Sequence, residues 1–573
     1  MASSKKASSI YYKGFDGIDT RKSHSGKETS ANIENFRIND DGTLELRNGY
    51  KVIANVGNKI TLAWAGDIRG TKKCYYVTSD RNVFSFNLST YASTQVGAFA
   101  NNTTAYCFFF YQGSLYLKTS SRIYLVTDST LSESTGYVPL VGKDWGTSLP
   151  GEIYQPINIM HKRFRISYKI PASHTAMLST MYPVASVVAL YRNGVELGST
   201  SYVLDTNLNV IKVAEIETGD EFVAVLERKS SSSLISSFKL ATKIKVFGDV
   251  SNSKLYIFGS NLKNNILCST MVSSADLTES EAVCPGYGEI YITEDAMFSV
   301  GDGDYTIKSI LRHHDRLIIF NQKQAWSVDP TGNAPAIKLN SPTGCYQLDG
   351  AVIADNIPYT VGPHGVLQWN INTTDPNKSH VEVISKEIHQ LLPSGFLRSC
   401  YLFYFAHRNE LWLYTQGFTT TVFIYNLSNK TWTSFTDLLM QDIFSFEEDM
   451  YLWYNYSIMV MKDDQYSDMG INGNGLPIKA KFTSGILSFD STDYKRLSEG
   501  KLIGDLNNAM VNMVITTDTG EEIYLPVNSS SKHTVDVRRL NSQRFRHLTF
   551  VLNCTGGTKP TIHSVKLTAR TKE

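Results

Sequence analysis

The chain has 573 residues, 12% of them aromatic, and its 55 Lys and Arg residues nearly balance its 54 Asp and Glu residues. This length is enough to bury a large core and predicts more than one domain. The balanced charge excludes a global basic field that would hold nucleic acid nonspecifically, and the longest apolar runs fall far short of the ~20 residues of a membrane span.

Residues 1–43 are expected to form an extended N-terminal arm. They are rich in Ser, Lys and Gly, show almost no alternation of apolar and polar residues, and end in the turn Asn39–Gly42. The basic side chains of this arm are candidates for docking on a neighbouring subunit, and a solvated flexible tail is the alternative. These candidate assembly residues are Lys5, Lys6, Lys13, Arg21, Lys22 and Lys27.

From residue 44 onward the chain repeats one β pattern, in which two apolar, aromatic strands flank a short turn. Two examples are KKCYYVTSDRNVFSFNLS at 72–89 and DMYLWYNYSIMVMKDD at 449–464. Repeats about 35 to 50 residues apart in an all-β chain predict a β-propeller of about seven four-stranded blades. We place the blades at 57–99, 102–141, 240–296, 304–340, 344–385, 397–436 and 438–464.

The last of these blades is one strand short, and the strand predicted at Leu44–Val56 has no early partner. We therefore predict that this N-terminal strand completes the last blade and closes the ring, which removes exposed sheet edges.

Two segments interrupt the regular spacing of the blade repeat. Residues 150–239 contain Asn193–Gly194, a strong two-residue hairpin signal, and predict an inserted β-sandwich. Residues 467–573 alternate strictly in several places and predict a C-terminal β-sandwich. The predicted fold is thus all-β: an about seven-bladed β-propeller formed by 44–149 and 240–466, with an inserted β-sandwich and a C-terminal β-sandwich.

The familiar catalytic and cofactor signatures GxxxxGK[ST], GxGxxG, GxSxG and HExxH do not occur in the sequence. On a strand, the neighbours His313 and His314 would point to opposite faces and could not chelate one metal. The acidic turn 301–304 has too few oxygen ligands for Ca²⁺, and the run that begins at Asp468 has Lys479 where a calcium loop needs Glu. We expect no catalytic, cofactor-binding or metal residues and no cofactor.

The cysteines are expected to be small buried residues of a chain that folds in a reducing cytosol, because they are odd in number and widely spaced. The polar N-terminus lacks the apolar segment of a signal peptide, so we expect a soluble product made inside a cell. Four arginines near the C-terminus are expected to flank strands as surface charge. The cysteines are Cys74, Cys107, Cys268, Cys284, Cys345, Cys400 and Cys554, and the arginines are Arg538, Arg539, Arg544 and Arg546.

Three stretches of the chain resemble virion proteins of tailed bacteriophages. The first runs from Gly14 to Ile53, the second is HHDRLIIFNQKQAWSVD with the later turn His364–Leu367, and the third spans 182–226, which is similar to a phage-tail module. The segments that match the first pattern are Ala31–Phe36, Asp41–Leu44 and Arg47–Tyr50, and those that match the third are Tyr191–Val195, Ser201–Val203 and Gly219–Val223. The family class indicated is the propeller-containing tail hub, nozzle or packaged-DNA stabilisation proteins of short-tailed phages.

The resemblance implies a ring, commonly of six copies, in the virion tail below the portal and adaptor. Such a ring would extend the DNA channel and help retain packaged DNA, which would pass through the lumen without sequence-specific binding. The sandwiches would contact distal tail proteins, fibres or spikes, and the chain would be made in the cytoplasm of the host bacterium. We expect no enzymatic activity; a receptor- or glycan-binding tail protein is the alternative, and a propeller glycoside hydrolase with paired carboxylates is a further one.

Overall fold

The computed structural model describes residues 7–21, 29–134, 140–144, 159–160, 162–229, 234–248, 253–259, 262–269, 290, 292, 297–330, 335–372, 374–416, 421–470, 472–489, 491–527, 534–540, 542–556 and 558–571, with only the backbone at 140–144 and 534–539. Within these ranges nearly every regular element is a β-strand. The short helices are α1 (Leu234–Leu240), η4 (Pro376–Lys378), η5 (His389–Leu391), α2 (Ser394–Leu397) and η6 (Ala406–Arg408). None of the helices in the described ranges has the length and apolar character needed to cross a bilayer.

Six blades of four antiparallel strands follow one another along the chain, and within each blade every strand pairs with the next in sequence. Five of these blades are separate sheets, and the sixth is part of a larger sheet. Blade one contains β6 (Ile60–Ile68), β7 (Thr71–Thr78), β8 (Asn82–Phe86) and β9 (Ser93–Ala98), and blade two contains β10 (Ala105–Tyr111), β11 (Ser114–Thr119), β12 (Ile123–Val126) and β13 (Leu131–Glu133). Blade three contains β22 (Lys243–Phe247), β23 (Lys254–Phe258), β24 (Asn265–Cys268) and β25 (Met297–Ser299), and blade four contains β26 (Ser309–His313), β27 (Arg316–Phe320), β28 (Ala325–Val328) and β29 (Ile337–Lys338). Blade five contains β30 (Val352–Ala354), β31 (Ile357–Gly362), β32 (Gly365–Asn370) and β33 (His380–Val383), and blade six contains β34 (Cys400–Phe405), β35 (Glu410–Thr415), β36 (Thr421–Asn426) and β37 (Thr431–Thr436).

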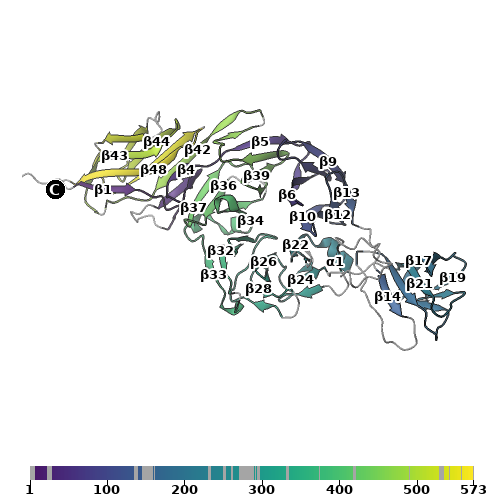
Figure 1. Cartoon of the computed structure of the whole chain (residues 1–573). Coiled ribbons are helices and arrows are strands. Elements are labelled where there is room, and N and C mark those ends of the chain that lie inside the picture. Colours follow the sequence, from purple (N-terminus) through teal and green to yellow (C-terminus); the bar gives the residue numbers. More distant parts are fainter. Residues whose placement is uncertain are drawn as a thin grey trace, which may run out of the picture.

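The seventh blade combines the two ends of the propeller sequence. β38 (Asp442–Phe446), β39 (Asp449–Tyr454) and β40 (Ser457–Met461) form three of its strands, and β5 (Tyr50–Asn55) pairs antiparallel with β40 as the fourth. The first strands of neighbouring blades contact one another in the order β6, β10, β22, β26, β30, β34, β38 and back to β6, so the ring is closed (Figure 1). The predicted β-propeller and its closure by an N-terminal strand are confirmed.

Neighbouring blades pack face to face, which explains why their middle strands are apolar on both sides. Between blades three and four, for example, Tyr256 and Phe258 share one buried cluster with Ile319 and Trp326. Because each blade supplies only half of such a core, a blade gains most of its stability from its neighbours, as repeats generally do.

The inserted β-sandwich lies between blades two and three and has a core of its own. One sheet contains β14 (Leu140–Asp144), β15 (Arg163–Lys169), β21 (Glu221–Arg228), β17 (Val184–Arg192) and β18 (Val195–Glu196), and the other contains β16 (Met177–Ser179), β20 (Val210–Val213) and β19 (Tyr202–Asp205). Asn193 and Gly194 both have positive φ and form the predicted two-residue hairpin. The predicted boundary at residue 239 is too late, because Phe238 of α1 is buried among residues of blades two and three.

The C-terminal β-sandwich contains strands from both ends of the chain. One sheet is formed by β3 (Phe36–Ile38), β4 (Leu44–Leu46), β48 (Thr561–Thr571), β43 (Lys495–Asp505) and β46 (Thr534–Arg539), with β1 (Ala7–Tyr12) paired to β48. The other is formed by β42 (Gly475–Ser484), β47 (Leu548–Gly556), β44 (Met510–Thr517) and β45 (Glu522–Val527), with β2 (Ser30–Glu34) and β41 (Ser467–Met469) also paired to β42.

The prediction of an extended arm at 1–43 is wrong for the described residues 7–21 and 29–43. Tyr12, Phe15 and Ile18 are buried in the main core, and Tyr12 packs edge-on against Phe482 and Phe550. The segment forms strands because it completes sheets whose other strands come from the C-terminal part of the chain. Its few apolar residues are spaced too widely to show a strand pattern of their own.

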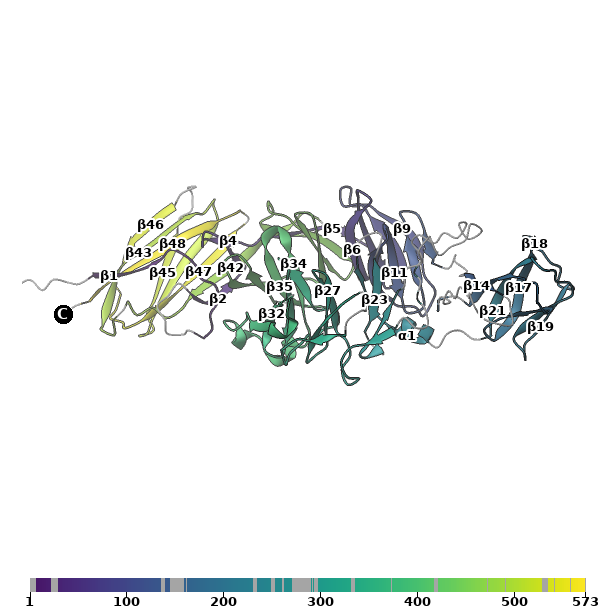
Figure 2. The ribbon, with the colours of Figure 1, turned by 60° about the horizontal axis from the view of Figure 1, so that its bottom comes forward.

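One continuous sheet links the propeller to the C-terminal sandwich. β2 pairs in parallel with β37 of blade six and antiparallel with β42, while β41 joins β42 to β5 of blade seven. The strand predicted at Leu44–Val56 is therefore two strands, β4 in the sandwich and β5 in the propeller. Figure 2 shows the sandwich, the propeller and the inserted sandwich in a row. Backbone hydrogen bonds between strands, rather than a single linker, hold the C-terminal sandwich to the propeller.

Candidate functional site

The contact between residues 35–49, blade six and β41 carries a group of buried charged residues that we call the seam. It contains Asp41–Leu44 and most of Arg47–Tyr50, two of the segments that match the first phage-like pattern. Ser434 on β37 holds this segment in place, because its backbone oxygen accepts from the Asn35 N–H at 2.8 Å and its hydroxyl donates to the Ile33 carbonyl at 2.8 Å. The seam is therefore positioned by backbone as well as side-chain hydrogen bonds.

Arg37 on β3 and Glu410 at the start of β35 form a buried ion pair in the seam. Arg37 Nε lies 2.8 Å from Glu410 Oε1, and the two side chains are 5% and 4% exposed. Arg37 also donates to Asn48 Oδ1 at 2.9 Å and lies over the Phe435 ring, while Glu410 accepts from the Trp412 indole at 2.9 Å. These additional partners satisfy the pair and so offset the cost of removing two charges from water.

Arg47 makes the second buried ion pair, with Asp468 at the start of the sandwich. Its Nη2 lies 2.7 Å from Asp468 Oδ2 and its Nη1 lies 3.0 Å from Oδ1, a bidentate arrangement. Arg47 Nε donates to Asn35 Oδ1 at 2.9 Å, and Arg47 Nη1 also donates to the Asn48 carbonyl at 2.9 Å. One arginine thus joins the N-terminal segment to the first strand after the ring.

Asp463, which follows blade seven, is the third carboxylate of the seam, and its side chain is 53% exposed, unlike those of Glu410 and Asp468. It accepts from Asn48 Nδ2 at 2.7 Å and from Arg408 Nε at 3.1 Å, and His407 lies 3.4 Å away. Burial alone would raise the pKa of Asp463, but the hydrogen bond and charge of Arg408, helped by Asn48 and His407, lower it to about 2. This carboxylate is therefore ionised at neutral pH and holds blade seven to the N-terminal segment.

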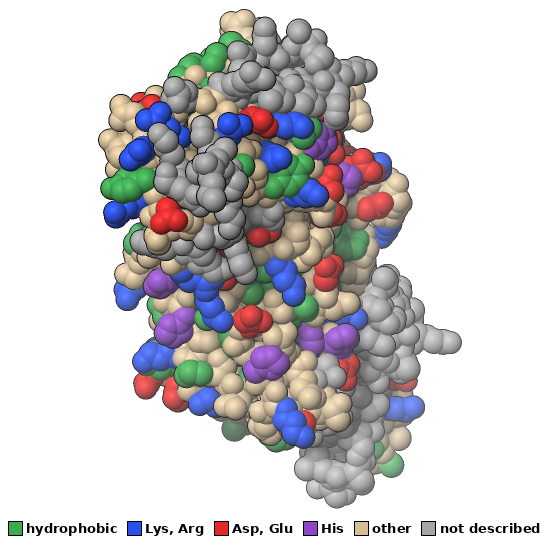
Figure 3. All heavy atoms as spheres, turned by 90° about the vertical axis from the view of Figure 1, so that its left-hand side faces the viewer, with side chains coloured by type: hydrophobic (Ala, Val, Ile, Leu, Met, Phe, Trp, Pro, Cys, Tyr) green, Lys and Arg blue, Asp and Glu red, His purple; other side chains and the backbone are tan. Residues whose placement is uncertain are grey.

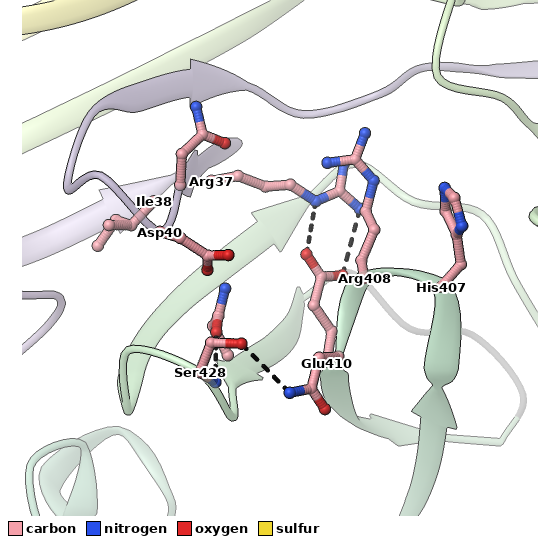
Figure 4. Close-up of a pocket in the computed structure, with 10 residues that line it drawn as sticks. Arg37, Ile38, Asp40, His407, Arg408, Glu410 and Ser428 are labelled. Atoms are coloured by element: carbon pink, nitrogen blue, oxygen red, sulfur yellow. Dashed lines mark hydrogen bonds and ion pairs between the residues drawn. The ribbon is translucent and has the colours of Figure 1, made fainter.

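A pocket of about 340 Å³ opens beside the seam (Figure 4). Its lining residues come from the β3–β4 turn, from η6 and the start of β35, and from the turn after β36; they are Arg37, Ile38, Asn39, Asp40, His407, Arg408, Asn409, Glu410, Asn426 and Ser428. None of them is Phe, Tyr or Trp. Several polar groups are already paired within the pocket, since Asn409 donates to the Ser428 hydroxyl and Asn426 accepts from the Ser428 backbone N–H. The pocket has the composition of a polar surface cleft and lacks the stacking ring of a typical sugar site.

A second charged group lies at the starts of the first strands of three blades. Asp442 accepts from the Tyr414 hydroxyl at 2.6 Å and from Gln416 Nε2 at 2.8 Å, and burial raises its pKa. Asp349, held at φ 60°, pairs with Lys245 at 2.7 Å. A propeller hydrolase would need a pair of carboxylates, and Asp442 and Asp349 are the two that this group offers. Sequence reasoning did not identify them because they lie 93 positions apart in different blades.

Two of the six predicted assembly residues, Lys13 and Arg21, lie in the described part of the chain. Lys13 lies over the Tyr11 ring at 5.1 Å, and Arg21 pairs with Asp19 at 3.1 Å and with Glu387 at 2.8 Å. Both thus have partners within the same chain. The other four, Lys5, Lys6, Lys22 and Lys27, lie outside the described residues.

The two neighbouring histidines do not both lie on a strand. His313 ends β26, but His314 has a φ of 53° and belongs to the turn, so the rings meet edge to face at 4.5 Å instead of pointing to opposite faces. Burial, together with the neighbouring His314, lowers the pKa of His313. Within the part of the chain that the structure describes, no group of three or more His, Cys, Asp or Glu side chains could hold a metal ion.

The remaining charges and thiols are arranged as follows. Arg546 lies over the Tyr494 ring at 4.7 Å, and Arg544 is exposed. Figure 3, which faces the end with the terminal sandwich, shows Lys and Arg interspersed with Asp and Glu. Cys74, Cys107, Cys345, Cys400 and Cys554 are buried free thiols as predicted, Cys268 is half-buried, and Cys284 lies outside the described residues.

No protein-family model and no curated protein matches this chain. Among solved structures it is similar to BamB from Moraxella catarrhalis, with 8% sequence identity and a TM-score of 0.34 over 70% of this chain and 83% of that one. It is similar to a structure of YCF48 bound to a D1 peptide at the same identity and TM-score, over 72% of this chain and 94% of that one. Likeness at this level says nothing about function. The propeller assignment rests on the seven blades of this chain and their order around the ring.

Proposed function

We propose that this chain is a structural protein of a tailed-phage virion and forms an oligomeric ring of the tail. In this role, as a hub or nozzle, it extends the DNA channel, helps retain packaged DNA and anchors neighbouring tail proteins. It binds neither a substrate nor a cofactor. Its mechanism is mechanical: a rigid subunit packs beside copies of itself in a closing, head-to-tail arrangement.

The observation that carries this proposal is the seam. Asn35, Arg47, Asn48 and Gly49 belong to the segment that resembles phage tail proteins, and all four hold the propeller to the terminal sandwich. A Cβ on Gly49 would lie 2.2 Å from a backbone oxygen of β41, so only glycine fits there. The resemblance therefore falls on residues that determine architecture, which favours a shared rigid subunit over a shared reaction.

The charge of the chain supports the same proposal. The formal net charge is +1, so a ring of such subunits has no strong general attraction for the phosphate backbone. DNA could pass such a lumen without binding to it.

The test is to interrupt the gene of this chain with an amber codon and examine the particles by electron microscopy. We expect heads that package DNA but lose it, and tails that lack one ring, with both defects reversed in a suppressor host. Infectious particles with complete tails and no detectable chain would refute the proposal.

The alternatives predict different results with the purified chain. A monomer that binds cell-surface polysaccharide would indicate a receptor-binding protein. Turnover of a glycan that is lost in Asp442→Asn and Asp349→Asn would indicate a hydrolase. A ring with an axial hole in negative stain, together with neither of these activities, is the result that we expect.

A further inference from the structure

The two outer faces of the C-terminal sandwich differ sharply in charge. On β43 and β48 the outward residues include Arg496, Glu499, Lys501, Asp505, Lys566 and Arg570. We call the outward surface of β45, β44 and β47 the uncharged face, and its residues are Glu522, Tyr524, Pro526, Met510, Asn512, Val514, Thr516, Thr549, Val551, Asn553 and Thr555. Glu522, at one margin, is the charged member of this set.

Strand register places the apolar members of the uncharged face next to one another. Tyr524, Val514 and Val551 lie side by side across the three strands, and Met510 lies farther along β44. Tyr524 is 62% exposed and Met510 is 70% exposed. In the adjacent row, Asn553 Nδ2 donates to Asn512 Oδ1 at 3.0 Å, so two amides at the centre of the face partly satisfy each other.

This arrangement has the composition of the centre of a protein–protein interface. Such centres are depleted in charge and enriched in Tyr and Met, and they are surrounded by a polar rim. Lys479 and Lys481 on β42 flank the uncharged face on one side, and Glu521 and Glu522 at the β44–β45 turn flank it on another. The rim thus carries both signs of charge, on separate margins.

The size of the face also fits this role. With strands ~4.8 Å apart and ~3.3 Å per residue, three strands of about seven residues cover roughly 330 Å². A standard interface buries about 800 Å² per partner, so the face can form its centre while the flanking residues complete the contact.

We propose that the uncharged face is the surface through which this chain binds a second copy of itself. The two oppositely charged margins select this occupant, because a second copy also carries both signs of charge, with 55 Lys and Arg against 54 Asp and Glu, whereas a partner of one sign would be repelled at one margin. A closed ring uses two different surfaces of each copy, so the uncharged face packs against another surface of the next copy. The inference deepens the proposed ring and depends on it only for the number of copies.

The test measures self-association of the full-length purified chain by sedimentation velocity over a range of concentrations. Tyr524→Lys and Met510→Lys, each at a highly exposed position, should weaken self-association at least tenfold without changing the melting temperature. Ile503→Lys makes a comparable apolar-to-lysine change at an outward position on β43 and should associate like wild type. A photo-crosslinker at Tyr524 should capture a peptide from another copy of the chain.

A wild-type chain that stays monomeric at about 100 µM would overturn the proposal, and so would unchanged association of both face variants. Capture by the crosslinker of only its own chain would have the same consequence. The gene-interruption experiment gives an independent result. Loss of the tail role with self-association intact would refute the proposed function alone, and complete tails assembled from Tyr524→Lys chains would refute this inference alone.

Discussion

Arg47→Met should open the ring at its closing blade. Arg47 is 1% exposed and Asp468 11% exposed, so the substitution leaves a nearly buried carboxylate without its cation and removes the donor to Asn35. Breaking a buried pair in this way costs about 3–5 kcal/mol. Three kcal/mol corresponds to roughly a hundredfold increase in the equilibrium constant for local opening.

The assay is native-state hydrogen exchange of the backbone amides that pair β5 with β40. A chain of several domains does not unfold in one two-state step, so local opening is a better readout than a single melting temperature. Arg122→Met is the matched control, because Arg122 and its partner Glu133 are 55% and 30% exposed and such pairs contribute about 0–1 kcal/mol. Adding Asp468→Leu to Arg47→Met should recover part of the loss. Exchange of β5 in Arg47→Met that is less than fivefold faster than in wild type would refute the reasoning.

Four further predictions concern other parts of the chain. Gly49→Ala should destabilise the seam by about 1–3 kcal/mol, because its Cβ would overlap a backbone oxygen of β41, whereas Gly57→Ala meets nothing within 4 Å and should be neutral in thermal denaturation. Deleting residues 1–43 should destabilise the terminal sandwich, seen as rapid proteolysis within it, because β1 to β3 complete its sheets; a protease-resistant product would contradict this. Replacing 162–229 with a short linker should leave the melting of the propeller unchanged, because the insert has its own core. Burial lowers the pKa of the Lys118 amine from 10.5 to about 8, so the folded chain loses this proton before the unfolded chain does and stability should rise between pH 8 and 10.5; Lys118→Met should abolish that rise.

The seven blades could be predicted from the sequence because their order is local. In six of them each strand pairs with the next along the chain, so the strands and the turns between them lie within a short stretch. Tyr76 and Phe84, for example, face each other across one hairpin and stack at 5.0 Å. The seventh blade could also be predicted, since its missing strand left a gap in an otherwise regular count.

The N-terminal segment could not be predicted correctly, because its partners lie at the other end of the chain. Ser9 contacts Thr568, 559 positions away, and Ser30 donates to the Thr483 carbonyl, 453 positions away. A short strand whose partners are so distant shows little alternation, since a few buried residues such as Tyr12 are enough to fix it. Low hydrophobicity therefore suggested an arm where the structure has sheet edges.

The seam was partly visible in the sequence. Arg47, Asn48 and Gly49 belonged to a recognisable motif, but the motif does not reveal that Arg47 meets Asp468, 421 positions away, or that Asn48 meets Asp463, 415 positions away. Asp468 drew attention only as the start of a run that does not fit a calcium loop. Its role became clear when β41 placed it beside the N-terminal segment.

The seam and the uncharged face separate two properties of the chain, the stability of its fold and its proposed self-association. Arg47 and Gly49 are enclosed, so variants there should lose stability and, as a consequence, assembly. Tyr524 and Met510 are exposed, so variants there should lose assembly while the fold keeps its stability. Assembly that survives the face variants would place the contact between copies elsewhere on the chain and would leave the tail role untouched. The face variants therefore test the proposed interface, and the gene interruption tests the tail role.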